Sequence, residues 1–125
     1  MQDLKNNISI ATSLAPAART ASANGTGVDL SGFDSAVAVI TPGAITDGTH
    51  TPKLQESDDD TTYTDVGAAD LIGSFAAIAA NTNQKVGYIG AKRFIRVVST
   101  VAGATNGGVY GATVIRGHAR NYPIA

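Results

Sequence analysis

Residues 92–101 read KRFIRVVSTV and form the most strand-like stretch of this 125-residue chain. Their bulky apolar side chains alternate between two faces, with Ile95, Val97 and Val101 on one face and Phe94 and Val98 on the other. Because successive side chains of a β-strand point to opposite sides, both sides of this segment are partly apolar. The pattern predicts a central strand, with Arg93 and Arg96 near one end, where they reach water.

Further strand-like segments recur along the chain and are separated by residues that favour turns. They cover residues 6–14, 34–41, 53–56, 61–66, 85–89 and 108–116. Pro16 ends the first segment or places it at a sheet edge, and Pro42-Gly43 closes the second. About seven or eight short strands with little helix predict a single all-β domain, an antiparallel β-sandwich or barrel-like fold.

Two regions of the expected domain allow alternatives. Residues 67–84 form either a short helix or a strand with an irregular return, and Gly73 disfavours the helix. Residues 1–23 are either an arm that adds a strand to a neighbouring chain or the ordinary first strand of the domain. At the C-terminus, Tyr122 and Ile124 either dock against a surface or fray.

The composition supports this fold and excludes some kinds of chemistry. The chain is rich in small and β-branched residues and contains 14 glycines, which suit short strands and tight turns. It has no Cys, so it offers no disulfide, thiolate nucleophile or cysteine metal site. No segment is long and apolar enough to cross a membrane, and no secretory signal is present. We therefore expect synthesis in a cytoplasm and no membrane partner.

The charges are segregated along the sequence. All ten acidic residues lie at or before Asp70, and six of the nine basic residues follow it. Three basic residues precede Asp70, so the first part carries −7 and the second +6, which together give the net charge of −1. We expect the two parts either to neutralise each other across the fold or to pair between neighbouring subunits.

The acidic stretch LQESDDDTTYTD, residues 54–65, is predicted to be the turn of a hairpin. A calcium loop of the EF-hand type that started at Asp58 would have Tyr63 where glycine is required and Ala69 where glutamate is required. An irregular calcium site formed by Asp58, Asp60 and Asp65 is the alternative. Adjacent carboxylates at a hairpin tip stay hydrated, so the stretch does not predict acid–base catalysis.

Other candidate sites for chemistry are weak. His50 is expected in an exposed loop, and His118 after the last strand, without the spacing of a zinc site. We find neither a nucleophile elbow nor a phosphate-binding loop, and we expect no enzymatic activity, cofactor or metal. The basic segment around Phe94 leaves nucleic-acid binding open as an alternative, although the net charge is negative. Sugar binding is disfavoured by the small number of aromatic residues.

Over its whole length the chain resembles a family of small structural proteins of tailed bacteriophages and prophages. The resemblance rests on residues 1–37, 54–66 and 86–123. It implies a virion protein, in the first place a capsid decoration or cement protein on the outer shell, and in the second place a head–tail connector or tail component. The implied partners are the major capsid protein and further copies of the chain. The family offers no catalytic residues to transfer.

If charged surfaces mediate these contacts, the expected interface residues come from two clusters. The acidic cluster is the hairpin turn with Asp58, Asp59 and Asp60. The basic cluster consists of Lys92, Arg93 and Arg96.

Overall fold

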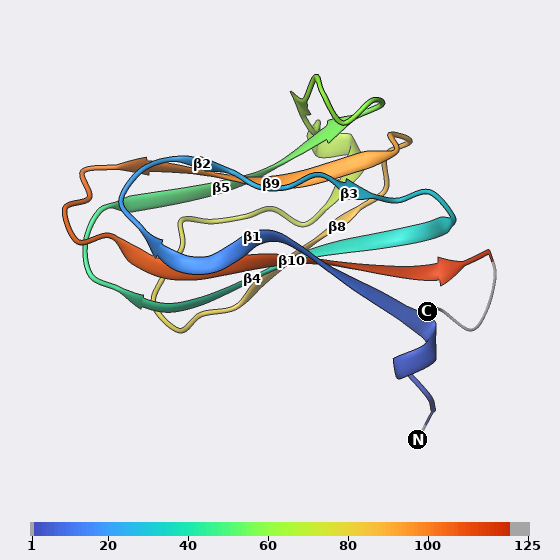
Figure 1. The fold of residues 1–125 in the computed structure, drawn as a ribbon, viewed down its shortest axis with the longest axis horizontal. Helices are drawn as coiled ribbons and strands as arrows, with labels where there is room; N and C mark the ends of the chain where they lie inside the picture. The colour runs from blue at the N-terminus through green and yellow to red at the C-terminus, as the bar shows by residue number, and fades with distance from the viewer. Residues whose placement is uncertain (1, 121–125) are drawn as a thin grey trace.

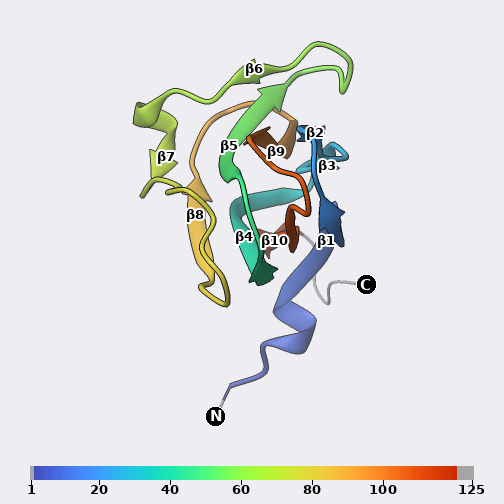
Figure 2. The same cartoon turned by 90° about the vertical axis from the view of Figure 1, so that its left-hand side faces the viewer.

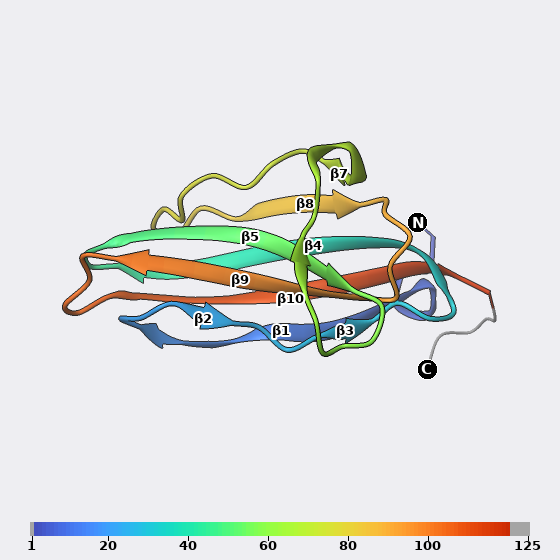
Figure 3. The ribbon, with the colours of Figure 1, turned by 90° about the horizontal axis from the view of Figure 1, so that it is seen from above.

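The computed structural model describes residues 2–120, which form two antiparallel sheets packed face to face (Figure 1). Sheet A contains, in spatial order, β1 (Ile8–Arg19), β10 (Gly108–Ala119), β4 (Phe33–Ile45), β8 (Gln84–Tyr88) and β7 (Leu71–Ile72). Sheet B contains β2 (Ala23–Asn24), β9 (Phe94–Ala102), β5 (Thr49–Ser57) and β6 (Thr64–Asp65), and β3 (Val28–Asp29) also pairs with β9. Figure 3 shows β5 and β9 lying over β4 and β10. The predicted all-β sandwich is confirmed, with ten strands in the described residues, four of them two residues long.

The predicted central strand is β9, which has neighbours on both sides. It pairs with β5 along its whole length and with β2 and β3 on its other edge. Ile95, Val97 and Ser99 on its inner side are fully buried. The alternation of apolar side chains in the sequence therefore correctly predicts which side of β9 faces the core.

Two strands are longer than predicted because prolines do not end them. β4 continues through Pro42-Gly43 to Ile45, and Pro42 lies opposite Tyr110, next to an irregularity in the β4–β10 register. β1 continues through Pro16 to Arg19 at an edge of sheet A, where its register also shifts. Proline lacks an N–H donor and is tolerated at such edges and irregularities. The second expectation for Pro16, an edge position, is correct.

The expected exposed histidine loop is wrong. His50 lies in β5 and only 1% of it is exposed. Its Nδ1 is 3.0 Å from the Tyr110 hydroxyl, which lies 3.0 Å from Ser99 Oγ, and its Nε2 is 3.1 Å from the Asp47 carbonyl oxygen. These contacts satisfy the polar atoms that burial removes from water. His118 likewise lies within β10 rather than after it.

The uncertain stretch 67–84 is mostly irregular. It contains the 3-10 helix η2 (Ala68–Asp70) and β7, and Gly73 then turns the chain with a φ of 91°. Ile78 is buried in the core, and its amide donates to the His50 carbonyl at 2.8 Å. Of the two expectations, a strand with an irregular return is the nearer one, although the strand covers only Leu71–Ile72.

The N-terminal segment belongs to the sheet from Ile8 onward, where β1 pairs with β10 of the same chain. The 3-10 helix η1 (Lys5–Asn7) precedes it. Tyr122 and Ile124 lie outside the described residues. No helix within residues 2–120 has the length and apolar character needed to span a membrane.

Ser13 joins the two sheets through the core. A register shift in β1 turns both Ser13 and Leu14 inward. The Ser13 hydroxyl accepts the Val97 amide of sheet B at 2.9 Å and donates to the Thr26 carbonyl at 3.0 Å. The segment between β2 and β3 passes close to Ser13 at Gly25. A Cβ atom at this position would overlap both Ser13 Oγ and the Val97 carbonyl oxygen.

Replacing Ser13 with alanine should lower the free energy of unfolding by about 1 to 3 kcal/mol, because it leaves a buried donor and acceptor unpaired. Urea denaturation of the full chain measures this. The control is Thr12→Ala, one residue away and exposed, which should change stability by less than about 0.5 kcal/mol. Equal effects of the two substitutions would contradict the role assigned to Ser13.

Candidate functional site: a charged groove

An open groove of about 480 Å³ lies at the end of the sandwich where the chain turns into β4 and β9 (right-hand end in Figure 1). We call it the charged groove. Apolar side chains of Leu30, Phe33 and Ile89 line it together with three basic and two acidic residues. The charged residues are Asp34, Asp58, Lys92, Arg93 and Arg120.

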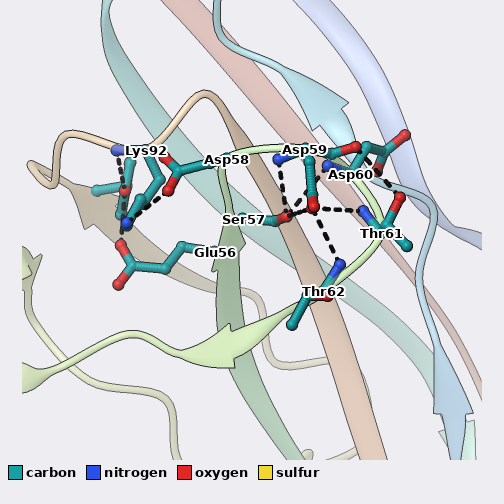
Figure 4. Close-up of polar contacts among 9 residues, drawn as sticks. Glu56, Ser57, Asp58, Asp59, Asp60, Thr61, Thr62 and Lys92 are labelled. Carbon is teal, nitrogen blue, oxygen red and sulfur yellow. Dashed lines mark hydrogen bonds and ion pairs between the residues drawn. The ribbon is translucent and has the colours of Figure 1, made fainter.

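Ion pairs connect the acidic and basic parts of the chain around this groove. Lys92 Nζ lies 2.8 Å from Asp58 Oδ2, and Figure 4 marks this contact with a dashed line. Arg93 forms a two-pronged pair with Asp29 at 2.9 and 3.0 Å. Arg120 lies 3.2 Å from Asp34. The expected neutralisation within the fold is therefore present, and all these side chains remain partly exposed to solvent.

The acidic turn is a hairpin connection, as predicted, and its own side chains order it. β5 leads into the turn and β6 follows it, and the two strands pair with each other. Ser57 Oγ accepts the amides of Asp59 and Asp60 at 3.2 and 3.1 Å (Figure 4). Asp59 Oδ1 accepts the amides of Thr61 and Thr62 at 2.9 and 3.0 Å. These amide bonds, the Thr62 bond first, lower the pKa of the Asp59 carboxyl to about 2.

Asp60 belongs to the turn itself, whereas Arg96 lies in β9 between the buried Ile95 and Val97, so its side chain is on the outer side of sheet B. Asp60 adopts a φ of 60° and accepts a hydrogen bond from the Tyr63 hydroxyl. The Arg96 guanidinium stacks 4.0 Å from the centre of the Tyr63 ring and donates two hydrogen bonds to Gln55 Oε1. Burial and the Asp60 carboxylate raise the pKa of the Tyr63 hydroxyl. These residues brace the turn and do not line the groove.

Tyr88 holds one wall of the groove in place. Its hydroxyl donates to Glu56 Oε1 at 2.7 Å and accepts the Lys92 amide at 3.0 Å. The connection between β8 and β9 is thereby attached to the end of β5. Burial, and next to it the bond to Glu56, raise the pKa of the Tyr88 hydroxyl, which stays a donor.

Three of the six residues predicted from the sequence share the groove, and three do not. Asp58, Lys92 and Arg93 line it. Asp59, Asp60 and Arg96 are instead engaged within the hairpin turn and the adjoining face of sheet B. The sequence reasoning missed the partners that complete the site, because these come from distant strands and turns. They are Asp29, Asp34, Glu56, Tyr88 and Arg120.

The geometry does not support the calcium alternative. Within residues 2–120 no three His, Cys, Asp or Glu side chains are grouped so that they could hold a metal ion. Asp58 turns to Lys92, Asp60 to Tyr63, and Asp65 to Lys53 and Gln55. Their carboxylates therefore diverge.

No protein-family model matches this chain, and no curated protein matches it.

Acid should destabilise the hairpin through Asp59. Its pKa is lower in the folded chain, about 2, than the roughly 3.9 of an unfolded aspartate. The stabilisation is therefore complete above pH about 4 and is lost as the pH falls toward 2. NMR titration of the Asp59 carboxyl carbon should give a midpoint near 2, and the melting temperature of Asp59→Asn should fall less steeply over this range than that of the wild type. A midpoint near that of free aspartate would contradict the turn geometry.

Proposed function

We propose that this protein is a structural component of a tailed-phage virion, and specifically a capsid decoration protein. It binds the outer surface of the major capsid protein shell and connects neighbouring capsid subunits without covalent bonds. The whole-chain resemblance supports this proposal. Within the structure, the charged groove carries it.

The charged groove has features that are expected of a binding surface for a repeating protein shell. Its side chains carry both signs of charge within one small area and are ordered by Tyr88 and by the ion pairs. An exposed ion pair contributes less than about 1 kcal/mol to stability, so Lys92 and Arg93 can exchange their partners for carboxylates of a neighbour at little cost. Complementary charges then set the orientation of the bound subunit.

Nucleic-acid binding is less well supported than protein binding. A protein that binds phosphates presents basic side chains that are free to displace counterions. Here Asp58 and Asp29 lie beside Lys92 and Arg93 and would repel phosphates, whereas a protein neighbour can offer basic groups to these aspartates. Arg96 is bound to Gln55 and stacked on Tyr63. The basic segment is therefore balanced locally by acidic and polar groups.

The copy number in purified, DNA-filled particles tests the proposed role. Quantitative mass spectrometry should give a number of copies equal to that of the major capsid protein or to a simple fraction of it. A handful of copies per particle would contradict decoration and indicate a connector or tail component. Complete absence from particles would overturn the virion assignment.

The groove itself is tested by removing its basic charges. The double variant Lys92→Gln/Arg93→Gln should keep its fold, because exposed ion pairs contribute little to stability, but it should bind particles that lack the protein more weakly than the wild type does. Raised salt should weaken binding of the wild type more than that of the variant, because screening acts on the charges that the variant lacks.

The matched control for this experiment is Lys53→Gln, which removes an exposed, ion-paired lysine of β5 that does not line the groove. It should bind as the wild type does. Binding that is equally strong in all three proteins and at all salt concentrations would exclude the charged groove as the contact.

A further inference from the structure

The edge of β4 that faces β8 is unpaired at the start of the strand. β8 pairs with β4 only from Ala36, which lies opposite Tyr88, to Ile40. The preceding residues of β4, Phe33–Ser35, have β10 on one side, and within residues 2–120 no strand lies on their other side. Figure 3 shows β4 extending past the end of β8, where the chain turns away toward β9. We call Phe33–Ser35 the free edge.

The charged groove lies along this free edge. Its lining includes the whole free edge and the connection that leads from Tyr88 to Arg93. This connection and residues 30–32 both cross from one sheet to the other at this end of the sandwich. The Leu30 amide donates to the Arg93 carbonyl oxygen at 2.7 Å and joins the two crossings. The groove therefore lies between two connected segments, with the free edge of sheet A in its wall.

An unpaired strand edge can bind an extended peptide, because it presents main-chain N–H and C=O groups that need partners. Proteins usually protect such an edge with a charge, a proline or a covering segment. The free edge contains no proline, and the charge of its exposed Asp34 is compensated by Arg120 at 3.2 Å. The groove beside it is open to solvent. The free edge is therefore accessible to a strand of another molecule.

The lining of the groove favours a peptide over a nucleic-acid strand. Its three basic and two acidic side chains give a formal charge of only +1. A neutral main chain can approach such a surface, whereas phosphates would be repelled by Asp34 and Asp58. The side chains of an extended peptide alternate between two faces. They can therefore contact apolar residues such as Phe33 and Ile89 as well as the charged residues of the groove.

We propose that the charged groove binds an extended peptide segment of the partner protein, which pairs with the free edge as an additional strand of sheet A. About three residues of the segment, or roughly 10 Å, lie against Phe33–Ser35. Main-chain hydrogen bonds hold the segment, and side chains of both charges, facing Lys92, Arg93 and Asp58, determine which sequence binds. This inference rests on the proposed function, in which the partner is the major capsid protein, and specifies how that protein is recognised.

Hydrogen–deuterium exchange followed by mass spectrometry tests the added strand directly. The wild-type protein is measured free in solution and bound to particles that lack it. Successive residues of a strand direct their N–H groups to opposite edges, so about one or two amides of the free edge gain a partner on binding. The peptide that covers residues 30–37 should therefore exchange more slowly, by about one or two amides, in the bound protein.

A substitution that fills the groove tests the same contact by its affinity. Ala91 is exposed and lines the groove. Ala91→Trp should weaken binding to the particles by about tenfold or more, because its ring and the added strand would overlap. The matched control is Ala102→Trp, which places the same ring on an exposed residue at the opposite end of β9 and should bind as the wild type does. Circular dichroism confirms that each variant is folded.

Two results would overturn the added strand and leave the proposed function standing: binding to particles without slower exchange at residues 30–37, or unchanged binding of Ala91→Trp. Absence of any binding to particles would contradict the proposed function and this inference together. Slower exchange at residues 30–37 on addition of a single-stranded oligonucleotide of mixed sequence would overturn the peptide in favour of a nucleic acid.

Discussion

The two sheets are held in register by hydrogen bonds that cross the core. Tyr110 of sheet A reaches His50 and Ser99 of sheet B, and Ser13 of sheet A reaches the Val97 amide of sheet B. The core includes small side chains such as Ala38, which fit several relative positions of two sheets nearly equally well. Hydrogen bonds are directional, and a buried polar atom without a partner is costly. The polar contacts therefore select one arrangement that apolar packing alone would leave less well defined.

The charged groove depends on this arrangement. The hydrogen bonds of Ser13 and Ser99 hold β9 in place. Because β9 begins at Phe94, its position also determines where Lys92 and Arg93 lie. β5 pairs with β9 along its length and brings Asp58 to within 2.8 Å of Lys92. Residues 34 positions apart in the sequence thus meet because two neighbouring strands end at the same side of the sandwich. Tyr88 then links the end of sheet A to the same place through Glu56.

The sequence contains enough information to predict the longer strands, their antiparallel class and the hairpin turn, because alternation and turn residues are local signals. It does not predict the two-residue strands β2 and β3. No local sequence pattern identifies the residue with which a buried polar group forms its hydrogen bond. The segment containing His50 resembles a loop because of the glycine and proline nearby, and its burial depends on Tyr110, 60 residues away. The prediction that Pro42 ends a strand is wrong for a similar reason, since the irregularity that accommodates Pro42 lies in the pairing of β4 with β10. In the candidate site, charge segregation predicts that ion pairs form, but only strand pairing decides that Arg93 meets Asp29.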